Sequence, residues 1–219
     1  MKKPITDAVK PLRMIFWGGL LCVFDVSFSQ VTYINDEIAS GFRFDFLNDF
    51  VGMLLITWGV LELAKFQIDD TYRKAMKFVF VCAALNSLEA LSEHLVFNLP
   101  VLVSILLHVL SLVTLAAAVL FCTSMIQLSK AYLLSTSAGS WLKTRALVTF
   151  LWAVPFGILH LITIFALVTN SPIYLDIGLF VIPVWLLVAI PLVHLFISTN
   201  RMREESAFSQ TPVPNLKPN

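Results

Sequence analysis

The sequence predicts an all-α membrane protein, a bundle of six transmembrane helices with both termini in the cytoplasm. The first observation is the composition: 58% of the 219 residues are hydrophobic and 13% are charged, whereas soluble proteins are about 25% charged. The second is a series of apolar stretches long enough to cross a bilayer. The third is the placement of basic residues in alternate connections. A multi-pass membrane protein follows from these observations together.

The apolar stretches number six, and each is near the ~20 residues that span about 30 Å of hydrocarbon. They are Met14–Ile34, Phe46–Ala64, Phe78–Phe97, Pro100–Phe121, Ala146–Val168 and Leu175–Ser198. Helices are expected because every backbone N–H and C=O must find a partner without water. Proline residues at positions 155, 183 and 191 predict kinks in the last two spans.

The basic residues set the predicted orientation. Of the fifteen Lys and Arg residues, only Arg43 falls on the side opposite to the termini. The others precede the first span, follow the last span, or lie between spans two and three or four and five. By the positive-inside rule, both termini are therefore cytoplasmic.

The first span allows a second interpretation. A basic start, an apolar run and the small residues Ser27 and Ser29 resemble a secretory signal that would be cleaved after Ser29. Asp25 interrupts the apolar run, and we expect the span to be retained.

Residues 1–200 are predicted to form a single transmembrane domain, and residues 201–219 a disordered cytoplasmic tail. The tail contains three prolines and few apolar residues. Span four is expected to continue as an amphipathic helix through residues 123–134. The following segment STSAGSW is interpreted as a turn region.

The segment FDFLNDFVG, residues 44–52, precedes and opens the second span. It resembles a pattern in small uncharacterised bacterial integral membrane proteins, in which two Asp residues flank a short step before an apolar residue and Gly. Those proteins typically have Pro at the position of Asn48. The resemblance implies a location in the bacterial inner membrane and no particular activity.

Charged residues near the outer ends of the spans have two interpretations. Asp45 and Asp49 lie at a helix N-terminus, where carboxylates are favoured by the helix dipole. Alternatively, they form an outward-facing cation or partner site. Glu93 and His94 are further outer-face candidates.

Four spans carry a narrow stripe of small or polar residues at helical spacing, which lipid cannot solvate and which should face the bundle interior. The stripes are Gly18, Cys22, Asp25 and Ser29; Cys82, Asn86, Glu89 and Glu93; Ser104, His108 and Ser111; and Gly157, His160 and Thr163. The cysteines are expected to be small apolar fillers.

Depth suggests that four of these polar groups meet. Asp25, Glu89, His108 and His160 each lie about eight or nine residues from the outer end of their span, or roughly 12–14 Å at 1.5 Å per residue. With Asn86 they form a predicted polar layer that binds a ligand or relays protons.

Several functions would use such a layer. Proton- or cation-linked transport of a small solute is the first, because intramembrane Asp, Glu and His residues mark such pathways. A non-catalytic scaffold or complex subunit is the second, with the layer acting as interhelical hydrogen bonds. An intramembrane metal-dependent hydrolase is the third, with Glu89, His108 and His160 holding a divalent cation. A haem ligated by both histidines is a further alternative.

An enzyme is not the expected class, because no GxSxG, HExxH or phosphate-binding glycine loop occurs. No cofactor is predicted beyond the divalent cation. A net charge of +1 gives no indication of a nucleic-acid partner. The expected partners are the lipid bilayer and a second copy or another membrane protein, since Gly18, Gly19, Gly52 and Gly59 permit close helix contacts within or between chains.

Overall fold

The structure is a computed structural model. It describes residues 4–23, 27–34, 37–45, 49–66, 68–93, 100–171 and 181–209.

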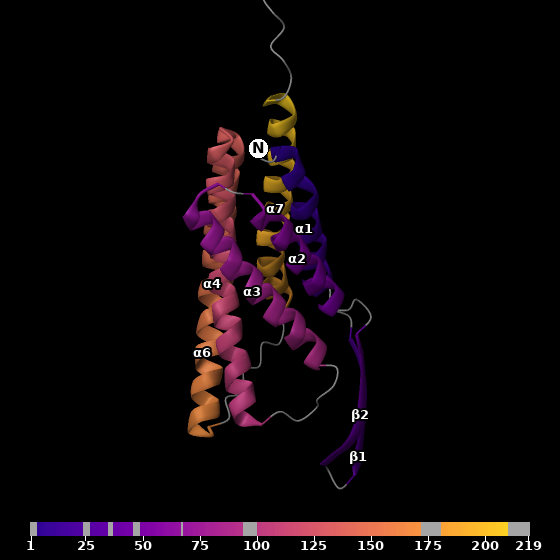
Figure 1. The fold of residues 1–219 in the computed structure, drawn as a ribbon. Coiled ribbons are helices and arrows are strands. Elements are labelled where there is room, and N and C mark those ends of the chain that lie inside the picture. Colours follow the sequence, from indigo (N-terminus) through magenta and orange to yellow (C-terminus); the bar gives the residue numbers. More distant parts are fainter. Residues whose placement is uncertain are drawn as a thin grey trace, which may run out of the picture.

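The described residues form an antiparallel helical bundle with one β-hairpin at its side (Figure 1). The helices are η1 (Ile5–Ala8), α1 (Val9–Val23), α2 (Asp49–Ala64), α3 (Asp70–Glu93), α4 (Val101–Ala131), α5 (Ser135–Leu147), the π-helical segment η2 (Val148–Ala153), α6 (Val154–Thr169) and α7 (Val181–Ser209). Each predicted apolar stretch overlaps at least one of these helices, so the helical bundle is confirmed for this part of the chain.

Residues 27–34 of the predicted first span form a β-strand, and a helix there was a wrong prediction. Strand β1 (Ser27–Ile34) pairs antiparallel with β2 (Glu37–Asp45), with Ser27 opposite Asp45 and Ile34 opposite Glu37. The segment SFSQVTYI alternates in polarity and contains β-branched and aromatic residues, which favour strands. Helix α1 therefore ends at Val23.

Helices α1 and α2 pack with their backbones in contact along three glycines, here called the glycine seam: Gly18, Gly52 and Gly59. A Cβ atom added at Gly18 would lie 2.4 Å from the carbonyl oxygen of Gly52, and one added at Gly59 would lie 2.6 Å from the carbonyl oxygen of Pro11. Small residues permit this approach, as they do in helix pairs of membrane proteins. The predicted close contact is thus confirmed within the chain.

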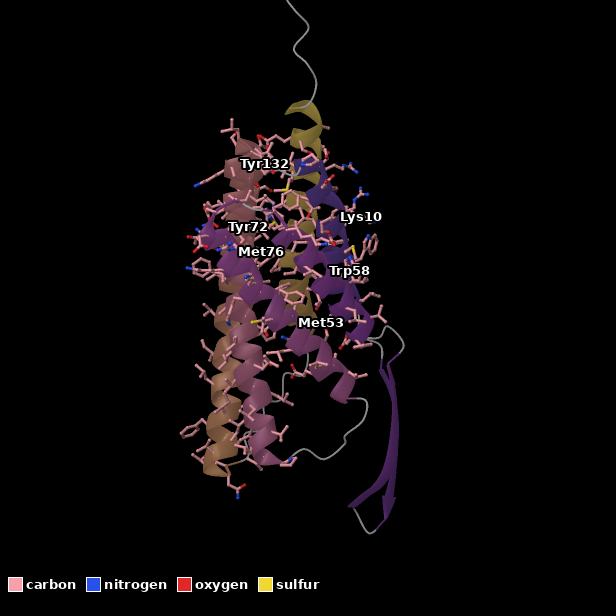
Figure 2. All side chains as sticks on the ribbon, in the orientation of Figure 1. Lys10, Met53, Trp58, Tyr72, Met76 and Tyr132 are labelled. Carbon is pink, nitrogen blue, oxygen red and sulfur yellow. The ribbon has the colours of Figure 1, made fainter. Side chains whose placement is uncertain are left out.

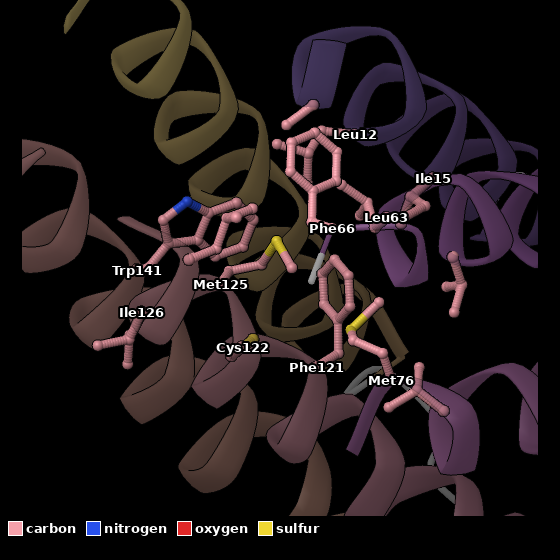
Figure 3. Packing of buried hydrophobic residues seen from close by; sticks show 14 of the residues in the cluster. Leu12, Ile15, Leu63, Phe66, Met76, Phe121, Cys122, Met125, Ile126 and Trp141 are labelled. Carbon is pink, nitrogen blue, oxygen red and sulfur yellow. The ribbon is translucent and has the colours of Figure 1, made fainter. Parts of the chain in front are cut away.

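The best-packed core lies toward the end of the bundle that holds the start of α1 and the end of α7 (Figures 1 and 3). The Trp141 ring is fully buried and meets the Phe121 ring edge-on, with 5.9 Å between ring centroids. The buried Tyr72 hydroxyl donates to the carbonyl oxygen of Leu63 at 2.8 Å and ties α3 to α2.

Helix α4 continues past its predicted span to Ala131, as expected for residues 123–131, and buries Met125 and Leu128 on its inner face. The segment STSAGSW was predicted to be a turn, but it begins helix α5. The actual turn lies between α4 and α5, where Leu133 has a left-handed φ of 59°.

The predicted irregularity at Pro155 takes the form of a π-helical turn. In η2 the Val154 N–H donates to the carbonyl oxygen of Thr149, five residues earlier. Pro155 has no N–H to continue the regular ladder, which explains why the wider turn occurs just before it.

Helix α7 extends to Ser209, so the prediction of disorder over residues 201–219 is wrong for residues 201–209. Residues 210–219 lie outside the described residues. The extension is held by contacts with α5 that are described below.

Among the described residues, two helices are long and apolar enough to cross a membrane, Val101–Ala131 and Ser135–Thr169, the latter joining α5, η2 and α6. In the most apolar 18-residue segment of each helix, 17% of the residues of the first helix and 0% of those of the second are buried in the bundle. A core helix of a soluble protein would be mostly buried. These helices therefore indicate, weakly, a membrane protein.

The glycine seam predicts a clear stability effect. Gly18→Ala and Gly59→Ala should each lower the free energy of unfolding by about 1–3 kcal/mol, because the new methyl group meets backbone atoms that cannot move aside. Thermal unfolding in detergent, followed by circular dichroism, measures the effect.

Gly139→Ala in α5 is the matched control, because nothing lies within 4 Å of its added Cβ. It should raise stability by about 0.5–1 kcal/mol through helix propensity. If all three variants unfold at the same temperature, the close backbone contact at Gly18 and Gly59 is contradicted.

Candidate functional site

Of the predicted polar layer, the structure brings two residues together. The rings of His108 on α4 and His160 on α6 lie 5.3 Å apart between centroids, with their planes inclined by 47°. Both side chains are half-buried. Neighbouring imidazoles on adjacent helices can share a proton or contribute two nitrogens to a cation.

Asn86 on α3 forms a hydrogen bond to α4. Its side-chain amide donates to the hydroxyl of Thr114 on α4 at 2.6 Å and to the carbonyl oxygen of Cys82 at 2.7 Å. The Thr114 hydroxyl in turn donates to the carbonyl oxygen of Leu110. The bond between Asn86 and Thr114 joins α3 to α4, as the interpretation of the layer as interhelical hydrogen bonding requires, and the other two bonds lie within one helix.

Glu89 lies nearly one turn beyond Asn86 and is half-buried. Within the described residues, no group of three or more His, Cys, Asp and Glu side chains is placed to hold a metal ion. Glu89, His108 and His160 are thus not assembled into the predicted three-ligand set. The physical reason is that α3 crosses α4 obliquely and its far end diverges from α4 and α6 (Figure 1).

The remaining predicted residues are placed as follows. Asp25 and His94 lie outside the described residues. Asp45 ends β2 opposite Ser27, and Glu93 is the last residue of α3. Asp49 begins α2, consistent with an N-terminal carboxylate, and its carbonyl oxygen accepts from the Cys22 thiol at 3.8 Å.

A second polar group lies between α5 and α7 and was missed by the sequence analysis. This hydroxyl seam consists of Ser140, Thr144, His194 and Ser198. The Ser198 hydroxyl lies 2.8 Å from both the Ser140 and the Thr144 hydroxyls, and the Thr144 hydroxyl lies 2.9 Å from Nδ1 of His194. The three hydroxyl residues are buried, so each bond satisfies a group that water does not reach.

Glu205 on the α7 extension caps the first turn of α5. Its carboxylate accepts from the backbone N–H groups of Thr136 and Ser137, at 3.1 and 2.7 Å, and from the Ser137 hydroxyl at 2.6 Å. Burial opposes the charge on this carboxylate, but the hydrogen bonds from the start of α5 outweigh it and lower the pKa of Glu205.

A signal for both groups was present in the sequence. Ser137, Ser140 and Thr144 recur at helical spacing, and so do His194, Ser198 and Glu205. This periodicity was overlooked because the prolines near the end of the chain predicted a disordered tail and the serines of STSAGSW predicted a turn.

The centre of the bundle holds a cavity of about 290 Å³, here called the central cavity. Helices α1, α2, α3, α4, η2 and α7 all contribute to its wall, which is mainly aliphatic and aromatic. The lining residues whose side chains carry a heteroatom are Thr114, Trp152 and the three cysteines of the chain, Cys22, Cys82 and Cys122. Trp152 belongs to the π-helical segment.

No protein-family model, curated protein or solved structure matches the chain.

The cap on α5 predicts a pH-dependent contribution to stability. Glu205→Gln should lower the free energy of unfolding at pH 7 by about 1 kcal/mol, the usual cost of losing a helix cap. Because the folded-state pKa of Glu205 is depressed, this contribution is full above the unfolded pKa of about 4.3 and is lost as the pH falls through the folded value.

Thermal unfolding of the wild type and the variant across this pH range measures the difference. Glu204→Gln, at the exposed neighbouring position, is the control and should have no effect. A difference between Glu205→Gln and the wild type that persists unchanged in acid would contradict the role of the ionised carboxylate.

Proposed function

We propose that the protein is a multi-pass protein of the bacterial inner membrane, with six spans and both termini in the cytoplasm. Support comes from the direction of the helices: the start of α1 and the end of α7 lie at one end of the bundle, and the start of α4 and the end of α6 at the other (Figure 1). The exposed apolar surfaces of α4 and α6 suit contact with lipid.

We further propose that its activity is to bind an apolar molecule in the central cavity, without chemical turnover. The observation that carries this proposal is the character of the cavity wall. A polar or charged ligand would lose its hydration there and find few partners, at a cost of several kcal/mol. The hydroxyl of Thr114 is already engaged with Asn86 and Leu110.

The size of the cavity favours a hydrocarbon of moderate length. It is about twice the ~150 Å³ of an engineered apolar cavity that binds benzene, and near the ~300 Å³ lower limit of small-molecule sites. A single aliphatic chain, such as the acyl chain of a fatty acid or lipid, is the class of ligand that fits these walls.

The paired histidines favour a second candidate, proton- or cation-linked transport. His108 and His160 lie together on the two helices that are long and apolar enough to cross a membrane, where an imidazole pair is costly without a role. Reconstituted liposomes with an internal pH-sensitive dye should then show flux under a proton gradient that His160→Gln abolishes. Absence of flux from the wild type under any cation gradient would end this candidate.

The binding proposal predicts labelling by a photoactivatable fatty acid. Diazirine-bearing palmitic acid should crosslink to peptides that line the central cavity, and unlabelled palmitic acid should compete. Ala117→Phe should reduce labelling about tenfold or more, because Ala117 is buried in the cavity wall and the new ring fills the space. Mass spectrometry of the digested protein reads the crosslinked positions.

Ala116→Phe is the matched control, since Ala116 is the preceding residue of α4 and is exposed. It should label as the wild type does. If the probe labels only exposed faces of α4 and α6, or if both variants label equally, the cavity does not bind acyl chains.

A further inference from the structure

A second hollow lies on the outer side of α1 and α2, away from the central cavity. It has a volume of about 370 Å³ and lies between the start of α1 and the end of α2. This hollow, here called the outer groove, is lined by Thr6, Asp7, Lys10, Met14, Trp58 and Glu62.

The glycine seam separates the two spaces. Ile15 and Val60 line the central cavity, whereas Met14, Trp58 and Glu62, one or two residues away along the chain, line the outer groove. Between them, the backbones of α1 and α2 touch at Gly59. A molecule in the groove is therefore independent of one in the cavity.

The groove is polar at one end and apolar along its length. Asp7, Lys10 and Glu62 place one cation and two carboxylates at the end that holds the start of α1. Figure 2 shows Lys10 and Trp58 on the same edge of the bundle, with Lys10 nearer that end.

From Trp58, which is 60% exposed, an outward apolar stripe continues along α2 through Leu54 and Val51, at 45% and 43% exposed. Trp17 on α1, 56% exposed, lies further along the same direction. Tryptophan and lysine at such a boundary are typical of the level of lipid headgroups. The order of charges, indole and aliphatic side chains follows the order of groups in a phospholipid.

We propose that the outer groove binds a phospholipid whose headgroup carries both a phosphate and a primary ammonium group. The proposal rests on the membrane placement proposed above. Lys10 supplies the charge for the phosphate, and Asp7 and Glu62 supply acceptors for the ammonium N–H donors. Glu62 also pairs with Lys65, and a carboxylate can accept hydrogen bonds from more than one donor.

Charge complementarity selects this headgroup over two others. A headgroup with a phosphate and no amine brings net negative charge toward two carboxylates. A trimethylammonium headgroup has the positive charge but no N–H donors, so it forms no hydrogen bonds with Asp7 and Glu62.

Native mass spectrometry of the full-length protein in detergent tests the proposal. The probes are phosphatidylethanolamine, phosphatidylglycerol and phosphatidylcholine with identical acyl chains. The wild type should retain phosphatidylethanolamine most strongly. Lys10→Gln should weaken this retention about tenfold, as expected for the loss of a charge-assisted hydrogen bond.

The Asp7→Asn and Glu62→Gln double variant should lose the preference for phosphatidylethanolamine over phosphatidylcholine. Lys130→Gln, an exposed charge at the end of α4, is the control and should leave all three lipids unchanged. Millimolar inorganic phosphate should not displace the lipid, which separates a lipid site from a phosphate site.

Equal retention of the three lipids by the wild type would overturn the proposal. So would an unchanged preference in both groove variants. Alkaline carbonate extraction separates this failure from failure of the proposed function: a protein that leaves the membrane pellet has neither role, whereas one that stays and labels in the central cavity lacks only the headgroup site.

Discussion

Backbone contact between α1 and α2 is the constraint on which the rest of the structure depends. At Gly18, Gly52 and Gly59 the two helices approach so closely that a single added methyl group would overlap backbone or tightly packed side-chain atoms. This contact fixes how both helices are rotated. Their inner faces then line the central cavity with α3, α4 and α7, and their outer faces form the charged groove.

Some polar side chains in the described helices connect one helix to the next, while many Ser and Thr hydroxyls donate to a carbonyl oxygen of their own helix. Asn86 joins α3 to α4, the Thr57 hydroxyl lies 3.0 Å from that of Ser87 between α2 and α3, and the hydroxyl seam joins α5 to α7. Satisfied in this way, these groups leave a mainly apolar centre. Because these Ser and Thr hydroxyls are used in hydrogen bonds within the protein, a bundle that contains many of them can still have a cavity with a mainly hydrocarbon wall.

Apolar length predicted the existence of the helices, and small residues at helical spacing predicted the contact of α1 with α2. Neither indicates where an apolar run leaves the helix, so the strand after Val23 was missed. Counting residues along each span placed Glu89, His108 and His160 at one depth. The crossing angle of α3 with α4 is set by packing across the bundle, and among the described residues Glu89, His108 and His160 do not form a three-ligand group.

The π-helical turn at Val148–Ala153 has a consequence for the cavity beside it. Val148 and Trp152 both line that space, and their backbone follows the wider hydrogen-bond pattern that precedes Pro155. The opposite wall is stiff, because α1 and α2 are locked main chain against main chain. The wall of the cavity is therefore easier to deform at η2 than at α1 and α2. A wider ligand would be accommodated by movement of the Trp152 indole and of the π-helical turn that carries it.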